Sequence, residues 1–162
     1  MSIAAIIPAG VFANLPALSD VTVEFGAIPA HMFEGSGVTV LTLGAGVTEI
    51  GDSAFANTAL TSAEMQNVTA IGAGAFANTA LTSAEIQNVT AIGAGAFEGS
   101  ALERVQLNAA ASVGERAFAN TKLTKMIIPT AGSFPLSAVD GTSAELRLPA
   151  DATDEQLAAW NE

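Results

Sequence analysis

The sequence contains no cysteine and no tyrosine, and its only histidine is His31. Without cysteine the chain can form no disulfide bond, has no thiol nucleophile and offers no thiolate ligand to a metal ion. His31 lies just before Phe33, at a position that equivalent segments fill with glycine or serine. We therefore interpret His31 as a corner residue rather than a catalytic base, and we expect no enzymatic activity, no cofactor and no metal ion.

Positive charge is absent from most of the chain, because residues 1–101 contain no lysine or arginine. The five cations all follow, as Arg104, Arg116, Lys122, Lys125 and Arg147. The formal net charge is −11, and a field of this sign repels the phosphates of nucleic acids and of anionic membranes. We expect neither as a partner. The acidity is also what keeps a chain with half its residues apolar in solution.

Long apolar runs are missing as well. No segment approaches the roughly 18 apolar residues that a membrane-spanning helix needs, so we expect no membrane insertion. Residues 1–20 are apolar but contain no basic residue and enter a repeat at once, which is not the pattern of a secretory signal peptide. We expect Ile3, Ile6 and Ile7 to form the first coil of that repeat.

The dominant positive feature is a 21-residue segment that occurs twice in succession. Residues 55–75 and residues 76–96 differ only at Met65 and Ile86. Weaker copies lie on both sides. Their phenylalanines recur every 21 or 22 residues, at Phe12, Phe33, Phe55, Phe76, Phe97 and Phe118. A fixed period of this length indicates a solenoid, in which each coil packs on its neighbours.

Each copy has apolar residues at fixed offsets from its phenylalanine. Ala84 and Ile86 flank Glu85, and this alternation predicts a short strand with one buried face. Strands one period apart must pair in parallel, because the chain returns to the same side at each turn. A second apolar step follows at Val89 and Ile92. After it comes a glycine that suits a tight bend or a positive φ angle, at Gly51, Gly72, Gly93 and Gly114.

This unit resembles the BspA-like leucine-rich repeat. The family unit runs Leu-x-x-Ile-x-Ile-Pro, Val-Thr-x-Ile-Gly and Ala-Phe-x-x-Cys-x-x-Leu. In this chain residues 60–81 read LTSAEMQNVTAIGAGAFANTAL, and the pattern recurs in register in the other copies. The resemblance covers about residues 6–130, with threonine or serine in place of most family cysteines. It implies a leucine-rich repeat solenoid, an α/β-type right-handed superhelix. Short parallel strands would form one face, with turns and short helical bends on the other.

The repeat pattern breaks after Pro129, where the next phenylalanine comes too early for the period. We expect a loop with one partial coil, and then a last strand at residues 146–149 ended by proline. A helix should follow, with Thr153 and Gln156 as a capping box. Residues 131–162 would then form a C-terminal helical cap on a single repeat domain.

The outward residues of the strands form the candidate binding surface. Residues one period apart should line up in columns across the coils, and the strand face is the usual recognition surface of a leucine-rich repeat. Strands about 4.8 Å apart make a face roughly 25 Å wide, which is the scale of a protein-binding patch. The candidate binding residues are Thr22, Glu24, Thr42, Glu64, Gln66, Glu85, Gln87, Arg104, Gln106, Asn108 and Lys125.

Charge is distributed unevenly along these columns. Glu64 and Glu85 should be direct neighbours, and like charges opposite each other on a sheet are destabilising. Two carboxylates are too few ligands for a good Ca²⁺ site, so the pair does not predict a metal. Arg104 and Lys125 follow in later coils, which predicts an acidic-to-basic gradient along the solenoid axis.

The resemblance implies a non-enzymatic protein-binding module. Because the BspA-like family is associated with adhesion and with binding of host or matrix proteins, a cell-surface or secreted protein is the first hypothesis. An intracellular, cytoplasmic interaction scaffold is the alternative, because no signal peptide is visible. A remote alternative is an ice- or surface-binding solenoid, suggested by threonine columns at Thr58, Thr79 and Thr121 and at Thr61, Thr82 and Thr124. The sequence indicates neither the partner nor the oligomeric state.

Overall fold

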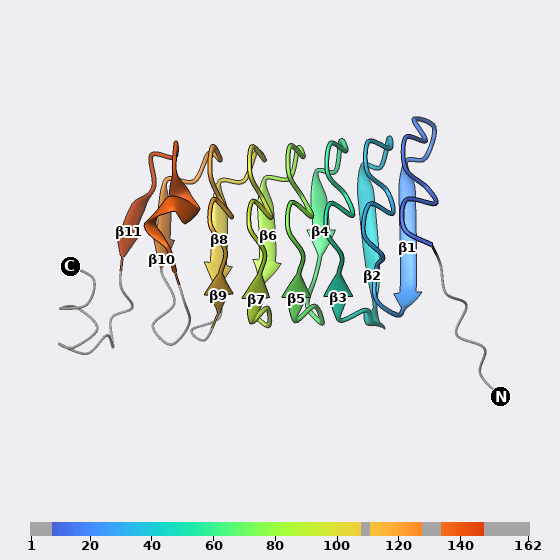
Figure 1. Ribbon diagram of the computed structural model, residues 1–162, viewed down its shortest axis with the longest axis horizontal. Helices are drawn as coiled ribbons and strands as arrows, with labels where there is room; N and C mark the ends of the chain where they lie inside the picture. The colour runs from blue at the N-terminus through green and yellow to red at the C-terminus, as the bar shows by residue number, and fades with distance from the viewer. Residues whose placement is uncertain (1–7, 108–110, 128–133, 148–162) are drawn as a thin grey trace.

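In the computed structural model the chain forms a solenoid of coils stacked along one axis (Figure 1). The structure describes residues 8–107, 111–127 and 134–147. Each described ladder between strands is parallel, as the repeat predicted. The parallel pairing therefore follows from a chain that returns to the same side once in every period.

The long face of the solenoid is built from one strand per coil. A five-stranded sheet contains, in spatial order, β1 (Asp20–Phe25), β2 (Val40–Gly46), β4 (Ser62–Glu64), β6 (Ser83–Ile86) and β8 (Arg104–Leu107). Beyond β8 the face continues with β10 (Lys125–Ile127) and β11 (Glu145–Arg147), which pair with each other. The register of β6 and β8 pairs Ser83 with Arg104 and Glu85 with Gln106, so residues one period apart lie side by side.

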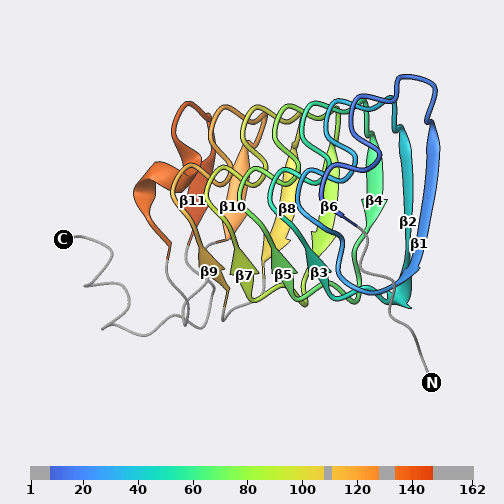
Figure 2. The same cartoon turned by 45° about the vertical axis from the view of Figure 1, so that its right-hand side comes forward.

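A second, four-stranded sheet lies on another side of the coils (Figure 2). It consists of β3 (Glu49–Ile50), β5 (Ala70–Ile71), β7 (Ala91–Ile92) and β9 (Ser112–Val113). The sequence predicted an apolar step here but no strand. Strands of two residues are too short to show an alternation of apolar and polar residues. The sequence pattern therefore does not predict this sheet, which is defined by pairing between neighbouring coils.

The phenylalanines form a continuous stack along the axis. Neighbouring rings from Phe12 to Phe118 have centroids 5.1–5.6 Å apart and planes within 13° of each other. This spacing is typical of offset stacking. Phe76, in the middle of the stack, is 0% exposed, whereas Phe12 at its N-terminal end is 39% exposed. The predicted phenylalanine core is confirmed for the coils that have a neighbour on both sides.

The corners around the phenylalanines from Phe12 to Phe118 are turns, so the expected short helical bends are wrong there. The amide N–H groups there bond alternately to the next coil and within the turn. Phe76 N–H donates to Ala96 O (2.7 Å), whereas Ala77 N–H donates to Gly74 O (3.0 Å). In a helix all these N–H groups would bond to carbonyl groups of their own coil. A helix is therefore incompatible with the hydrogen bonds between neighbouring coils.

Two residues in each corner have positive φ angles, two positions before and two positions after the phenylalanine. In one coil they are Gly74 (φ 61°) and Asn78 (φ 55°). Asparagine tolerates this left-handed conformation better than most residues. His31 occupies the first of these positions in its own coil, with φ 57°. The interpretation of His31 as a corner residue is therefore confirmed.

The glycine before each corner has a different role from the one expected. None of Gly51, Gly72, Gly93 and Gly114 has a positive φ. Instead, their coils approach one another too closely for a side chain. A Cβ on Gly72 would lie 2.6 Å from Asp52 N and 2.7 Å from Gly51 C, both backbone atoms of the preceding coil. Close backbone approach, rather than bend geometry, explains these glycines.

Gly72→Ala should therefore destabilise the protein by about 1–3 kcal/mol, the range for overpacking that the backbone must move to relieve. Urea unfolding measures the loss. The matched control is Ala73→Ser, which adds one heavy atom at the adjacent exposed position and should change stability by less than about 0.5 kcal/mol. Equal stabilities for the two variants would show that the coils can separate freely at Gly72.

A buried hydroxyl lies three residues after most of the phenylalanines, at the position of the family cysteine. Thr79 is 5% exposed, and its Oγ1 donates to the carbonyl oxygen of Phe76 (2.9 Å). Thr58 and Thr121 make the same bond to Phe55 and Phe118. Each hydroxyl thereby satisfies a buried carbonyl group and is itself satisfied.

The repeat continues beyond the predicted break. Phe118 N–H donates to Ala138 O (2.7 Å), and Thr142 Oγ1 donates to Val139 O (2.8 Å), which repeats the bonds of earlier corners. Val139 thus takes the phenylalanine position one period after Phe118, and Phe134 only packs beside the core. The corner includes η1, a 3-10 helix at Leu136–Val139.

The described part of the expected C-terminal cap, residues 134–147, is therefore a further coil of the solenoid. The last strand is confirmed as β11, with the pairing that continues the long face. The helix expected at Thr153 and Gln156, and the first coil expected from Ile3, Ile6 and Ile7, lie outside the described residues. The part of the chain that the structure describes contains no helix long and apolar enough to cross a membrane.

Candidate binding face

The outward residues of the long face lie in the predicted columns. The register pairs Thr22 with Thr42, Thr42 with Glu64, Glu64 with Glu85, and Glu85 with Gln106. All five side chains are exposed. Because the apolar residues between them face the core, nothing in the packing of the coils occupies this outer surface. The strand face therefore presents one polar side chain from each of five successive coils.

Glu64 and Glu85 are direct neighbours, as predicted. They are the one pair in the ladder between β4 and β6. Both line a hollow of 390 Å³ on the long face, together with Thr42 and Gln66. Among the described residues, no group of three or more histidine, aspartate or glutamate side chains could hold a metal ion. The arrangement is an acidic hollow open to the outer surface.

The other candidates in the described part of the chain lie outside the acidic hollow. Thr22 and Glu24 line a hollow at the N-terminal end of the described stack, beside the exposed Phe12. Gln87 donates to Gln106 across neighbouring coils, with Nε2 3.4 Å from Oε1. Asn108 lies outside the described residues. Binding by any of these residues stays a prediction, because the structure places them without a ligand.

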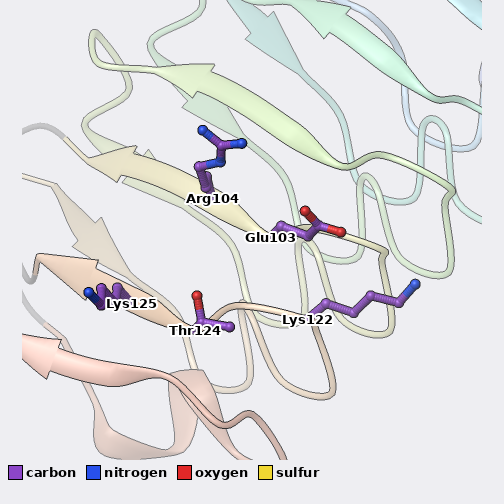
Figure 3. Close-up of a pocket in the computed structure, with 5 residues that line it drawn as sticks. All are labelled: Glu103, Arg104, Lys122, Thr124 and Lys125. Atoms are coloured by element: carbon purple, nitrogen blue, oxygen red, sulfur yellow. The ribbon is translucent and has the colours of Figure 1, made fainter.

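A second hollow on the long face is cationic. Its volume is 370 Å³, within the range of about 300–1,000 Å³ found for ligand sites. Figure 3 shows the side chains that line it, which are Glu103, Arg104, Lys122, Thr124 and Lys125. The sequence analysis named two of these, Arg104 and Lys125. It missed the others because they precede the strands, although Lys122 stands where sister copies have alanine.

The cationic hollow lies where the long face is interrupted. β8 and β10 are neighbours in space (Figure 1), but they belong to different sheets. No ladder joins them within the part of the chain that the structure describes. A ladder would hold the two strands at the usual spacing of about 4.8 Å. The cationic hollow therefore lies across the boundary between the two sheets.

The cations of this hollow have no ionic partner within the described residues. The ion pairs found there are His31–Glu34, Arg116–Glu98 and Arg147–Glu145. In one of them a hydrogen bond from the guanidinium to Glu98, 2.5 Å long, raises the pKa of Arg116 above its ordinary value. The charges of Arg104, Lys122 and Lys125 are instead directed to solvent, where a ligand can reach them.

The sequence also named His31 and two threonine columns, of which the one containing Thr61, Thr82 and Thr124 is exposed. His31 bonds to Glu34 at an exposed corner, with Nδ1 2.7 Å from Oε2. Of the two threonine columns, the one containing Thr58, Thr79 and Thr121 is buried and cannot contact ice, which corrects that part of the remote alternative. What the molecule presents is a polar strand face with an acidic and a cationic hollow.

Comparison with known proteins identifies the repeat. The family model described as a BspA type leucine rich repeat region matches residues 26–138, in six copies. Residues 26–138 include both hollows of the long face. A search of curated proteins and a search of solved structures each gave no match.

Proposed function

Because the chain belongs to the BspA-type leucine-rich repeat family, we propose that its long strand face binds a protein partner at the cell surface or in the extracellular space. Repeats of this kind generally serve as non-enzymatic protein-interaction modules. The observation that carries the proposal is the strand face itself. Five coils present exposed polar residues in register, and the face contains two hollows of opposite charge.

The charge pattern supports a partner with a preferred orientation. Glu64 and Glu85 lie on β4 and β6, and Arg104 lies on the next strand, β8. A partner with the opposite order of charges is attracted in one orientation and repelled in the reverse one. This gradient favours a specific partner over general adhesion to any charged surface.

Peptides selected from a random display library on the purified protein supply a ligand with which to test the face. Glu85→Lys and Arg104→Glu should each weaken binding by about tenfold, because each replaces an attraction by a repulsion. The control is Glu49→Lys on β3, in the second sheet, which should leave affinity unchanged. All three positions are exposed, so the melting midpoint should move little. Binding that is lost in Glu49→Lys and retained in the other two variants would place the partner on the second sheet and contradict the proposal.

The extracellular setting is tested separately, by fractionating cells that make the full-length protein. Recovery from the cell surface or the medium is the expected result. Recovery from the cytosol would make the protein an intracellular interaction scaffold, with the same binding face.

A further inference from the structure

The equivalent positions in other copies of the repeat show which residues a coil needs at the cationic hollow. Lys122 occupies the position of Ala59, Ala80 and Ala101 in other copies, and Arg104 and Lys125 occupy that of Ser62 and Ser83. These positions are at the surface, and Arg104, Lys122 and Lys125 are all exposed. Because sister coils fold with alanine and serine there, the three charges are not needed for packing. Their presence together calls for a role other than stability.

Three of the five cations in the whole sequence meet at this one hollow, in a protein of net charge −11. Exposed charges more than about 8 Å apart are largely screened at physiological ionic strength. A ligand group inside the hollow is therefore governed by Arg104, Lys122 and Lys125 and by the Glu103 carboxylate that lines it. The next carboxylate, Glu145, pairs with Lys125 across β10 and β11, but it is itself bonded to Arg147. The hollow is locally cationic, even though the molecule is strongly acidic.

The arrangement of the cations favours several separated negative groups over a single one. Figure 3 shows the charged ends of Arg104, Lys122 and Lys125 spread around the hollow and pointing in different directions. A lone phosphate concentrates its charge at one point and is best held by donors that converge on it. In an extended peptide, by contrast, side chains on one face recur every second residue, about 7 Å apart.

We propose that this hollow anchors an acidic segment of the protein partner through its aspartate or glutamate carboxylates. The proposal rests on the function proposed for the strand face and specifies the chemistry of its ligand. The Arg104 guanidinium can bind one carboxylate through two parallel hydrogen bonds. Lys122 and Lys125 bind others as point charges, and the Thr124 hydroxyl supplies a further donor.

The neighbouring charges define the order of residues in the bound segment. Glu103 repels a carboxylate at its own edge of the hollow, which limits how many acids the segment can place there. Glu85 lies on β6, the strand next to β8, and Glu64 lies on the strand beyond it. A segment that crosses the strands would therefore present acids to β8 and β10 and a basic residue toward β6 and β4.

The test uses fluorescence anisotropy at low ionic strength, with a short fluorescein-labelled peptide of alternating glutamate and glycine. Its counterparts replace glutamate by glutamine or by phosphoserine. We expect the parent protein to bind the glutamate peptide and not the glutamine peptide. Each of Arg104→Ser, Lys122→Ala and Lys125→Ser should weaken binding about two- to fivefold, and the triple variant on the order of 10- to 100-fold.

These variants restore residues that sister coils already have, so each should melt at the parental temperature by circular dichroism. Arg116→Ser removes the same charge at a corner outside the hollow, where another coil has Ser53, and should leave peptide affinity unchanged. The assignment is overturned if the triple variant binds as the parent does, if Arg116→Ser is equally harmful, or if the phosphoserine peptide binds and the glutamate peptide does not. If display-selected peptides bind the strand face and the glutamate peptide does not, this inference fails while the proposed function stands.

Discussion

Deletion of residues 76–96 should leave a folded solenoid that is one coil shorter. The deletion joins Ala75 to Phe97, so Ala75 is again followed by a phenylalanine, as it is by Phe76 in the parent chain. Phe55 and Phe97 would become neighbours in the phenylalanine stack, and β4 would pair with β8 in the same register. Each coil contacts only its neighbours, so every ladder loses one rung and keeps its continuity.

Deletion of residues 76–85 is the matched control, because it removes part of a coil. It joins Ala75 to Ile86 and places the remainder of a strand where a corner must form. Every later coil would then be out of register with the preceding ones, and the stack should unfold. Circular dichroism and denaturant melts compare the two. A 21-residue deletion that loses its β signal as completely as the shorter one would contradict a stack of independent coils.

Phe76→Ala should cost about 3–5 kcal/mol of unfolding free energy, the range for truncation of a buried phenylalanine. Its ring is fully buried and stacks on Phe55 and Phe97, with centroids 5.5 and 5.3 Å away. Truncation leaves a cavity between two rings that the hydrogen-bonded corners prevent from closing. A loss of this size is a large part of the total stability of an ordinary domain, about 5–15 kcal/mol.

Phe12→Ala is the control for this variant, because Phe12 contacts a single ring of the stack and is partly exposed. Its truncation removes less buried area and opens no enclosed cavity, so it should cost clearly less than Phe76→Ala. Denaturant unfolding of both proteins gives the comparison. A cost below about 1 kcal/mol for Phe76→Ala would mean that the phenylalanine column is not the structural core.

These predictions depend on a property of solenoids that made the sequence unusually informative. Residues one period apart in the sequence are neighbours in space, so the spacing of Phe55 and Phe76 was already a spatial contact. The same rule placed Glu64 beside Glu85 and set Ser83, Arg104 and Lys125 in one column. For the repeated part of the chain, the period therefore determined the parallel pairing, the core and the polar columns of the strand face.

The sequence could not show how the backbone of each coil meets the next one. The role of Gly72 depends on the distance between two backbones, and the absence of helical bends depends on N–H groups alternating between coils. Val139 replaces a phenylalanine without resembling one, because a partly buried position at the end of the stack requires only an apolar side chain that packs against the core. The evidence for this replacement is that residues 138–142 repeat the hydrogen bonds of the earlier corners.

The candidate site also has one part that the sequence determined and one part that only the tertiary structure decided. The sequence alone determined which residues of the repeat point outward, because alternation and period fix the direction of each strand side chain. The cationic hollow was decided by tertiary structure, because its lining residues come from two stacked coils whose strands, β8 and β10, belong to different sheets. Lys122 lies between the corner and β10 rather than on a strand, and only the stacking of two coils brings it to the same hollow as Arg104.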